Sequence, residues 1–214
     1  MEARLSRDIR GGGAGLLWLL AVAGYAYTVV TQARISSDHA GLVRDASEAI
    51  VFGAALFSAS TVGFVVAVQK RRHPVGWLFL ALGVAVSIGG AGDTYALDAL
   101  VVHGGSGTAA ELALVVGKAS FIIWFAILAA ILQLTPTGRP LSRRWALFTT
   151  GAVGAGVVGL AAKLVQDTEF ETPYAGVQNP WAIPSISGFV DLVAGLAITA
   201  AGIGLLVGAA SFFV

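Results

Sequence analysis

Six ionisable residues lie inside long apolar stretches of this sequence, where a charged side chain is costly. They are Asp93, Asp98, Glu111, Lys118, Lys163 and Asp191. Such groups usually face a partner or a water-filled cavity, so these six are candidates for sensing a ligand or a proton, or for fixing helix packing. The three histidines fall in separate loops, and no P-loop, nucleophile elbow or zincin helix is present. We therefore expect no metal, no cofactor and no catalysis in this chain.

Asp93 and Lys118 are expected at the same depth in a membrane. Asp93 lies nine residues before Val102, the outer end of one predicted helix, and Lys118 lies nine residues after Ala109, the outer start of the next. At 1.5 Å per residue this depth is roughly 13 Å, near the middle of a hydrocarbon layer about 30 Å thick. An unpaired charge there is unfavourable, so we predict an Asp93–Lys118 ion pair, with Asp191 as the alternative acid.

Asp98, Glu111 and Lys163 lie nearer the outer boundary, as does His103. With Lys118 they predict a polar funnel that opens outward. Glu111 and Lys118 are seven residues apart, which places both on one helix face, expected to point into the bundle. For the outer residues a structural role is the simpler interpretation, whereas for Asp93, Lys118 and Asp191 packing and sensing are equally open hypotheses.

The composition determines the kind of fold that positions these residues. The 214 residues are 57% hydrophobic and 12% charged, with a mean hydropathy of +0.82. Soluble domains carry about 25% charged residues, and the apolar runs lack the alternation of barrel strands, so an all-α, polytopic membrane protein is predicted. We expect an N-terminal tail over 1–11 and a six-helix transmembrane bundle over 12–214. Its spans are 12–32, 49–69, 75–102, 109–134, 146–165 and 183–214.

Basic residues gather on one side of this predicted bundle. Nine of the thirteen Lys and Arg residues lie in the N-terminal tail and in the second and fourth connections, whereas the other side holds Arg34 and Arg44. Cytoplasmic loops retain basic residues, so both termini are predicted to be cytoplasmic in a cell-membrane protein. Tyr174 and Trp181 are expected in the outer headgroup layer. Contacts to inner headgroups, or coupling to a cytoplasmic domain, are expected for Arg71, Arg72, Arg139, Arg143 and Arg144.

Charge balance and small residues limit the partners. The net charge of +1 argues against nucleic-acid binding, and the absence of cysteine excludes disulfides and thiolate metal sites. Gly204 and Gly208 have the spacing of closely packed membrane helices, within one chain or at a homodimer contact.

The last apolar run reaches Val214 without a basic flank. This ending favours a further cytoplasmic domain, missing here, after the sixth helix.

Three short motifs indicate a family. HPVGWL at 73–78 follows a basic run, DTYAL stands at 93–97, and PTGRP at 136–140 precedes SRRW. Over nearly the whole chain these motifs resemble the multi-span N-terminal input region of actinobacterial-type two-component sensor histidine kinases. His73 and Thr135 stand where that family usually has Asn and Phe.

The resemblance implies a sensory input module. Such a module passes a stimulus by helix rearrangement to a kinase domain in the same chain, and from there to a response regulator. The family's ATP-binding domain and phosphoaccepting histidine are absent from this sequence. The residues also allow two alternatives. One is a small transporter or channel that uses the buried Asp and Lys residues, with helices that break near Gly89 and Gly92. The other is a membrane scaffold whose ion pairs only fix packing.

Overall fold

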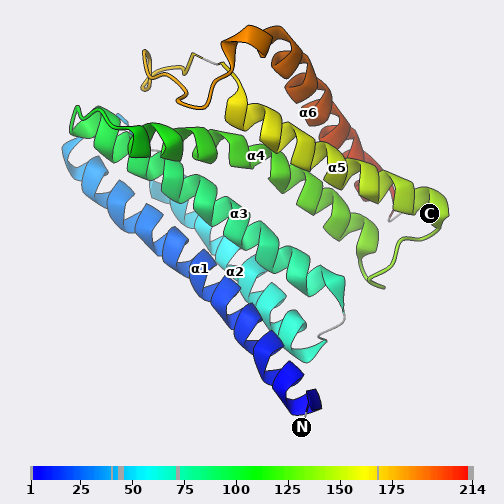
Figure 1. Cartoon of the computed structure of the whole chain (residues 1–214). Helices are drawn as coiled ribbons and strands as arrows, with labels where there is room; N and C mark the ends of the chain where they lie inside the picture. The colour runs from blue at the N-terminus through cyan, green and yellow to red at the C-terminus, as the bar shows by residue number, and fades with distance from the viewer. Residues whose placement is uncertain (1, 40, 43–45, 71–72, 168, 212–214) are drawn as a thin grey trace.

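The described residues form six α-helices, and the longest connection is the loop between α5 and α6 (Figure 1). The computed structural model describes residues 2–39, 41–42, 46–70, 73–167 and 169–211, without the side chains of 2–11, 38, 46–50 and 52. The helices are α1 (Glu2–Asp38), α2 (Ala46–Gln69), α3 (Pro74–Ala96), α4 (Thr108–Leu134), α5 (Arg143–Val165) and α6 (Ser187–Ala210). A π-helix, η1 (Leu97–Val102), continues α3, and a short 3-10 helix, η2 (Pro184–Ile186), precedes α6. The described ranges contain no strand, so the all-α prediction is confirmed.

Five of the helical segments are long and apolar enough to cross a membrane. They are Gly12–Ser37, Pro74–Val102, Thr108–Leu134, Arg143–Val165 and Pro184–Ala210. The apolar stretch described in α2, Gly53–Gln69, is shorter. A membrane protein is therefore indicated, whereas the count of six spans and the cytoplasmic termini stay predictions.

The helix α1 is longer than the predicted span. The tail expected over 1–11 is helical from Glu2 onward. Residues 2–10 are rich in arginine, leucine, alanine and glutamate, which favour helix, whereas each glycine at 11–13 costs about 1 kcal/mol. Extending an existing helix is much easier than starting one, so the long apolar helix continues through these glycines.

The bundle consists of two groups of three helices (Figure 1). The helices α1, α2 and α3 pack against one another, and so do α4, α5 and α6. Among the described helices, the two groups touch where α3, with its η1 extension, lies beside α4. This α3–α4 junction therefore holds the two halves together.

Glycines let neighbouring helices approach closely within the chain. A Cβ atom on Gly208 would lie 3.1 Å from the Leu132 Cβ, and one on Gly204 would lie 2.5 Å from the Ala152 Cβ. Both glycines are buried. The close packing predicted for this pair is confirmed, and it occurs between α6 and its neighbours α4 and α5.

The connection between α5 and η2 is an ordered loop fastened by Asn179. This buried amide donates hydrogen bonds to the carbonyl oxygens of Leu164, at 3.0 Å, and Gln166, at 2.8 Å. Its own oxygen accepts a hydrogen bond of 2.9 Å from the backbone N–H of Trp181. One side chain therefore ties the end of α5 to the last part of the loop.

Replacing Asn179 with alanine is expected to lower the free energy of unfolding by about 2 kcal/mol, because buried carbonyl groups lose their donors. Unfolding of the purified protein in mixed detergent micelles measures the change. The exposed neighbour Gln178 provides the control, since its replacement by alanine should change stability by less than about 0.5 kcal/mol. Equal effects of the two substitutions would contradict the structural role of Asn179.

The same loop also contributes apolar side chains to the core. Tyr174 is 4% exposed and lies in a buried cluster with Ile35 of α1 and Leu114 of α4. Phe170 and Val177 pack against this cluster. The loop therefore packs against helix ends from both halves.

Candidate functional site

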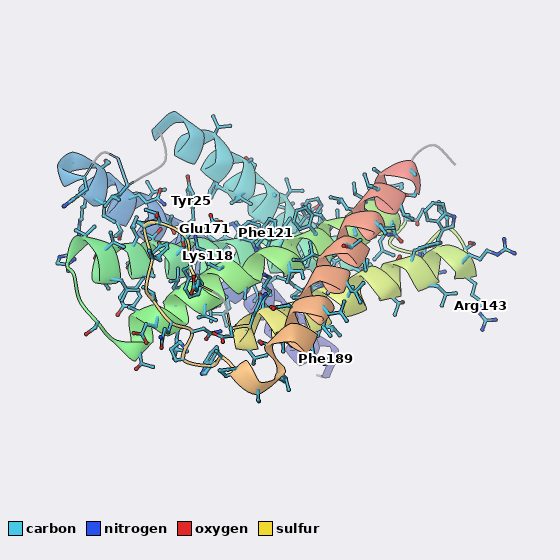
Figure 2. All side chains as sticks on the ribbon, turned by 90° about the horizontal axis from the view of Figure 1, so that it is seen from above. Tyr25, Lys118, Phe121, Arg143, Glu171 and Phe189 are labelled. Atoms are coloured by element: carbon cyan, nitrogen blue, oxygen red, sulfur yellow. The ribbon has the colours of Figure 1, made fainter. Side chains whose placement is uncertain are left out.

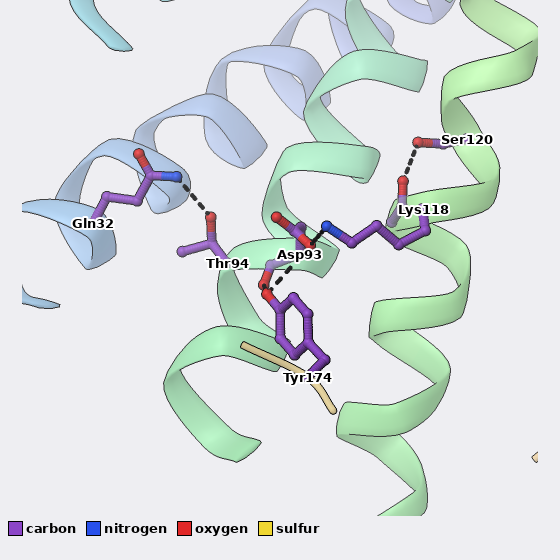
Figure 3. Close-up of polar contacts among 7 residues, drawn as sticks. Gln32, Asp93, Thr94, Lys118, Ser120 and Tyr174 are labelled. Atoms are coloured by element: carbon purple, nitrogen blue, oxygen red, sulfur yellow. Dashed lines mark hydrogen bonds and ion pairs between the residues drawn. The ribbon is translucent and has the colours of Figure 1, made fainter. Parts of the chain in front are cut away.

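Asp93 and Lys118 meet at the α3–α4 junction (Figure 3). The Lys118 Nζ lies 2.7 Å from the Asp93 Oδ1, so the predicted ion pair is confirmed, whereas its depth in a membrane stays a prediction. The Lys118 side chain is 49% exposed and that of Asp93 is 42% exposed. Both side chains line a cavity, which accounts for this exposure. The ion pair is therefore reachable by a small molecule.

Glycines at the junction bring the two charges together. A Cβ on Gly117 would lie 2.8 Å from the backbone nitrogen of Asp93, and one on Gly92 would lie 2.6 Å from the carbonyl oxygen of Ala113. Side chains at these positions would push the helices apart. Because Lys118 directly follows Gly117, the close approach of the backbones places its ammonium group beside Asp93.

Tyr174 is the third member of the site. Its hydroxyl group donates to the backbone oxygen of Asp93 at 3.0 Å and lies 3.3 Å from the Asp93 Oδ1 (Figure 3). The Lys118 Nζ lies 5.2 Å from the centre of the Tyr174 ring, within cation–π range. The Asp93–Lys118–Tyr174 cluster thus joins α3, α4 and the α5–α6 loop.

The position predicted for Tyr174 is wrong. The side chain was expected in the headgroup layer, yet it is buried. A buried tyrosine hydroxyl needs a hydrogen-bond partner, and Asp93 provides it. Nothing in the spacing of the sequence indicates that the loop folds inward, although the apolar Phe170 and Val177 around Tyr174 are a weak signal of burial.

The environment of Tyr174 favours its neutral form. Burial raises the pKa of the Tyr174 phenol well above its ordinary value of 10.0, and the negative charge of Asp93 and their hydrogen bond raise it further. A raised pKa means that the phenol stabilises the fold while it is protonated. This contribution is complete below about pH 10 and is lost as the pH rises through and above the unfolded-state value.

Replacing Tyr174 with phenylalanine is expected to cost about 1–2 kcal/mol at neutral pH, since Asp93 loses a donor. Above about pH 10 the difference from the wild type should shrink, because unfolding lets the wild-type phenol ionise. Unfolding in micelles across this pH range tests the trend. Phenolate absorbance is the second measurement, because Tyr174→Phe should leave the titration of the folded protein unchanged up to about pH 11. A lost phenolate signal in that range would contradict the burial of the hydroxyl.

A cavity of about 430 Å³ lies beside the ion pair. It is lined by α1, α2, α3 and α4, and we call it the four-helix cavity. Asp93 and Lys118 are at its charged end. The remaining polar side chains that line it are Tyr25, Thr28, Gln32, Ser60, Ser87 and Trp124.

A second cavity, of about 450 Å³, lies between α4, α5, α6 and the α5–α6 loop. Lys163, Glu169, Glu171 and Tyr174 line this loop cavity. Lys118 and Phe121, labelled on α4 in Figure 2, line both cavities. The Lys118 residue therefore borders both cavities.

Asp191 does not serve as the acid for Lys118. Its Oδ1 accepts a hydrogen bond of 2.7 Å from the side-chain amide of Gln166. Because α6 begins at Ser187 rather than at residue 183, Asp191 lies in the first turns of this helix, beside the end of α5. The alternative pairing with Lys118 is not realised.

The predicted outer funnel is realised only where Lys163 and Lys118 share the loop cavity. Asp98 instead contacts His103, whose Nδ1 lies 3.5 Å from the Asp98 Oδ1 and 2.8 Å from its backbone oxygen. Glu111 lies in the first turn of α4 and forms no ion pair with any residue that the structure describes. The π-helix η1 contains Asp98, and its wider turns rotate this residue away from the face expected of a regular α-helix.

The inner arginines lie near the connection between α4 and α5. Arg139, Arg143 and Arg144 are exposed, and Arg71 and Arg72 lie outside the described residues. The ring Nε2 of His73 is 3.0 Å from the carbonyl oxygen of Pro136, so the second and fourth connections touch. Binding of these arginines to headgroups stays a prediction.

Neither a metal site nor a similar protein identifies the function of the site. Within the described ranges, no three His, Asp or Glu residues form a group that could hold a metal ion. No family model, curated protein or solved structure matches the chain. The described residues form a helical structure whose long apolar helices indicate a membrane protein, with an ion pair beside a cavity. The resemblance to sensor kinases rests on the short sequence motifs alone.

Proposed function

We propose that this chain is the membrane input module of a sensor histidine kinase, without its kinase domain. It would pass a stimulus from the membrane or the outer side to a cytoplasmic kinase domain by helix rearrangement. The observation that carries the proposal is that one residue, Asp93, joins α3, α4 and the α5–α6 loop, through its carboxylate to Lys118 and through its backbone and carboxylate oxygens to Tyr174. The module itself performs no chemistry, and its surroundings are the lipid bilayer and a response regulator reached through the kinase.

The cluster supplies an element with two states. While Asp93 is charged, it binds the Lys118 ammonium, and its oxygens accept from Tyr174. A proton or ligand that competes at the Asp93 carboxylate weakens the ion pair with Lys118 and the 3.3 Å contact of Tyr174, and favours a packing in which α4 and the loop lie differently against α3. A stimulus shifts such an equilibrium only by its difference in affinity for the two states.

The test is whether a change at the cluster reaches the inner connections. The natural chain has no cysteine, so Lys70→Cys and Leu141→Cys introduce unique spin-label sites in the two exposed inner connections. In liposomes, Asp93→Asn is expected to shift the distance distribution between these labels. The control is Asp167→Asn, an exposed acid at the end of α5, which should leave it unchanged. An identical distribution in wild type and Asp93→Asn would contradict the sensor proposal.

A transporter is the second candidate, because Lys118 lies between the four-helix cavity and the loop cavity. A charged residue between two cavities is also the arrangement of a gated pathway. Solute flux in proteoliposomes that disappears on Asp93→Asn would favour transport over sensing. The scaffold alternative requires that a neutral replacement of both Asp93 and Lys118 leave all function intact.

A further inference from the structure

We propose that the four-helix cavity binds one uncharged amphiphile with a hydroxyl or amide head, taken up from the bilayer. The inference rests on the proposed sensory function and names the class of its stimulus. At about 430 Å³ the cavity falls within the range of about 300–1,000 Å³ typical of small-molecule sites. Its apolar lining suits the body of such a molecule, and its polar groups suit the head.

The cavity opens towards the side of the bundle. Leu56, Phe57 and Ser60 of α2 form one wall, and Phe121 and Trp124 of α4 form the other. In the part of the chain that the structure describes, the backbones of α2 and α4 do not approach each other closely. Phe57 is 44% exposed and Phe121 is 46% exposed, and both lie in the middle of their helices. An entrance between mid-helix residues faces lipid rather than water.

The charges of the cavity favour an uncharged ligand. Among the described residues that line it, the charged ones are Asp93 and Lys118, and these are joined at 2.7 Å. Each therefore already has its counter-ion. A ligand with a net charge would lose its hydration without gaining an opposite charge, whereas a neutral head loses little.

The hydrogen-bonding groups favour a head that both donates and accepts. The hydroxyl groups of Thr28, Ser60 and Ser87 donate to carbonyl oxygens of their own helices, at 3.0, 2.8 and 3.1 Å. Their lone pairs are left to accept a hydrogen bond. The indole N–H of Trp124 is buried and has no acceptor. A hydroxyl or amide group matches this set, because it donates to the hydroxyl oxygens and accepts from the indole.

Quenching of Trp124 fluorescence by a brominated monoacylglycerol tests the site. In phosphatidylcholine liposomes the probe should quench saturably at low mole fraction, and Trp124→Phe should remove the saturable part. A brominated fatty acid in its ionised form, and brominated phosphatidylcholine, should quench only in proportion to their mole fraction. Saturable quenching by either of these, or none by the monoacylglycerol, would overturn the proposed ligand class.

Two variants test whether the monoacylglycerol binds inside the four-helix cavity. A Cβ on Gly90 would lie 3.5 Å from the Thr28 Oγ1, an ordinary contact, so Gly90→Leu fills the cavity from its wall. It should raise the half-saturating mole fraction at least tenfold, whereas Gly195→Leu on the exposed face of α6 should not. The smaller change Ser87→Ala should weaken binding severalfold without filling space. Unchanged binding in both cavity variants would overturn the site.

The spin-label pair separates this inference from the proposed function. Saturable binding that leaves the distance between positions 70 and 141 unchanged would support the ligand site and contradict the proposed sensory function. A distance change on Asp93→Asn without saturable binding would keep the sensor and contradict the ligand class.

Discussion

Replacing Lys118 with methionine is expected to lower the free energy of unfolding by about 2–3 kcal/mol, because Asp93 is left charged without a counter-ion at the junction of two apolar helices. The side chains are about half exposed to the cavity, so the cost lies below that of a fully buried pair and above that of a surface pair. Unfolding by a denaturing detergent in mixed micelles measures the change. Lys163→Met is the matched control, since Lys163 forms no ion pair with the residues that the structure describes.

A double-mutant cycle measures the interaction energy between Asp93 and Lys118 separately from the effect of each single substitution. Combining Lys118→Met with Asp93→Asn removes both charges and should restore at least half of the stability lost in Lys118→Met, so the coupling energy should be at least about 1 kcal/mol. The neutral asparagine still accepts a hydrogen bond from Tyr174. If the two single changes simply add, Asp93 and Lys118 do not stabilise each other, and the cluster has no ion pair to switch.

Replacing Gly117 with leucine is expected to have a still larger effect, a loss of more than about 3 kcal/mol. The new Cβ would lie 2.8 Å from the backbone nitrogen of Asp93 and 3.1 Å from the carbonyl oxygen of Gly89. These are backbone atoms, which cannot turn aside as a flexible side chain does. The helices must therefore separate, and α3–α4 packing and the ion pair weaken together.

The control for Gly117 is Gly195, which lies on an exposed face of α6 with nothing within 4 Å of an added Cβ. Gly195→Ala should be neutral or stabilise by up to about 1 kcal/mol, since alanine favours helix. Gly117→Ala should already destabilise, by about 1–3 kcal/mol. Equal stability of Gly117→Ala and the wild type would contradict the close approach of α3 and α4.

The sequence sufficed to predict the helices and the central pair, because both depend on local quantities. Hydropathy along the chain identifies the apolar runs, and the rise per residue places Asp93 and Lys118 at one depth. Two consecutive helices that run antiparallel bring residues of equal depth side by side, and α3 and α4 pack against each other in this way.

The remaining site residues depend on tertiary contacts that depth alone cannot predict. Asp191 could pair with Lys118 only if it lay on the face of α6 that approaches Lys118. Because α6 begins at Ser187, Asp191 instead lies beside Gln166. Tyr174 belongs to a loop whose path depends on apolar contacts with both halves. The π-helix at Leu97–Val102 turns Asp98 away by a local change of winding that the sequence pattern does not indicate.

The single α3–α4 junction also sets an order of events during synthesis on the ribosome. The first three helices leave the ribosome before the last three, so Asp93 emerges 25 residues ahead of Lys118. Tyr174 follows only after α5. Closure of the cluster therefore marks the moment at which the late half of the nascent chain has docked onto the early half.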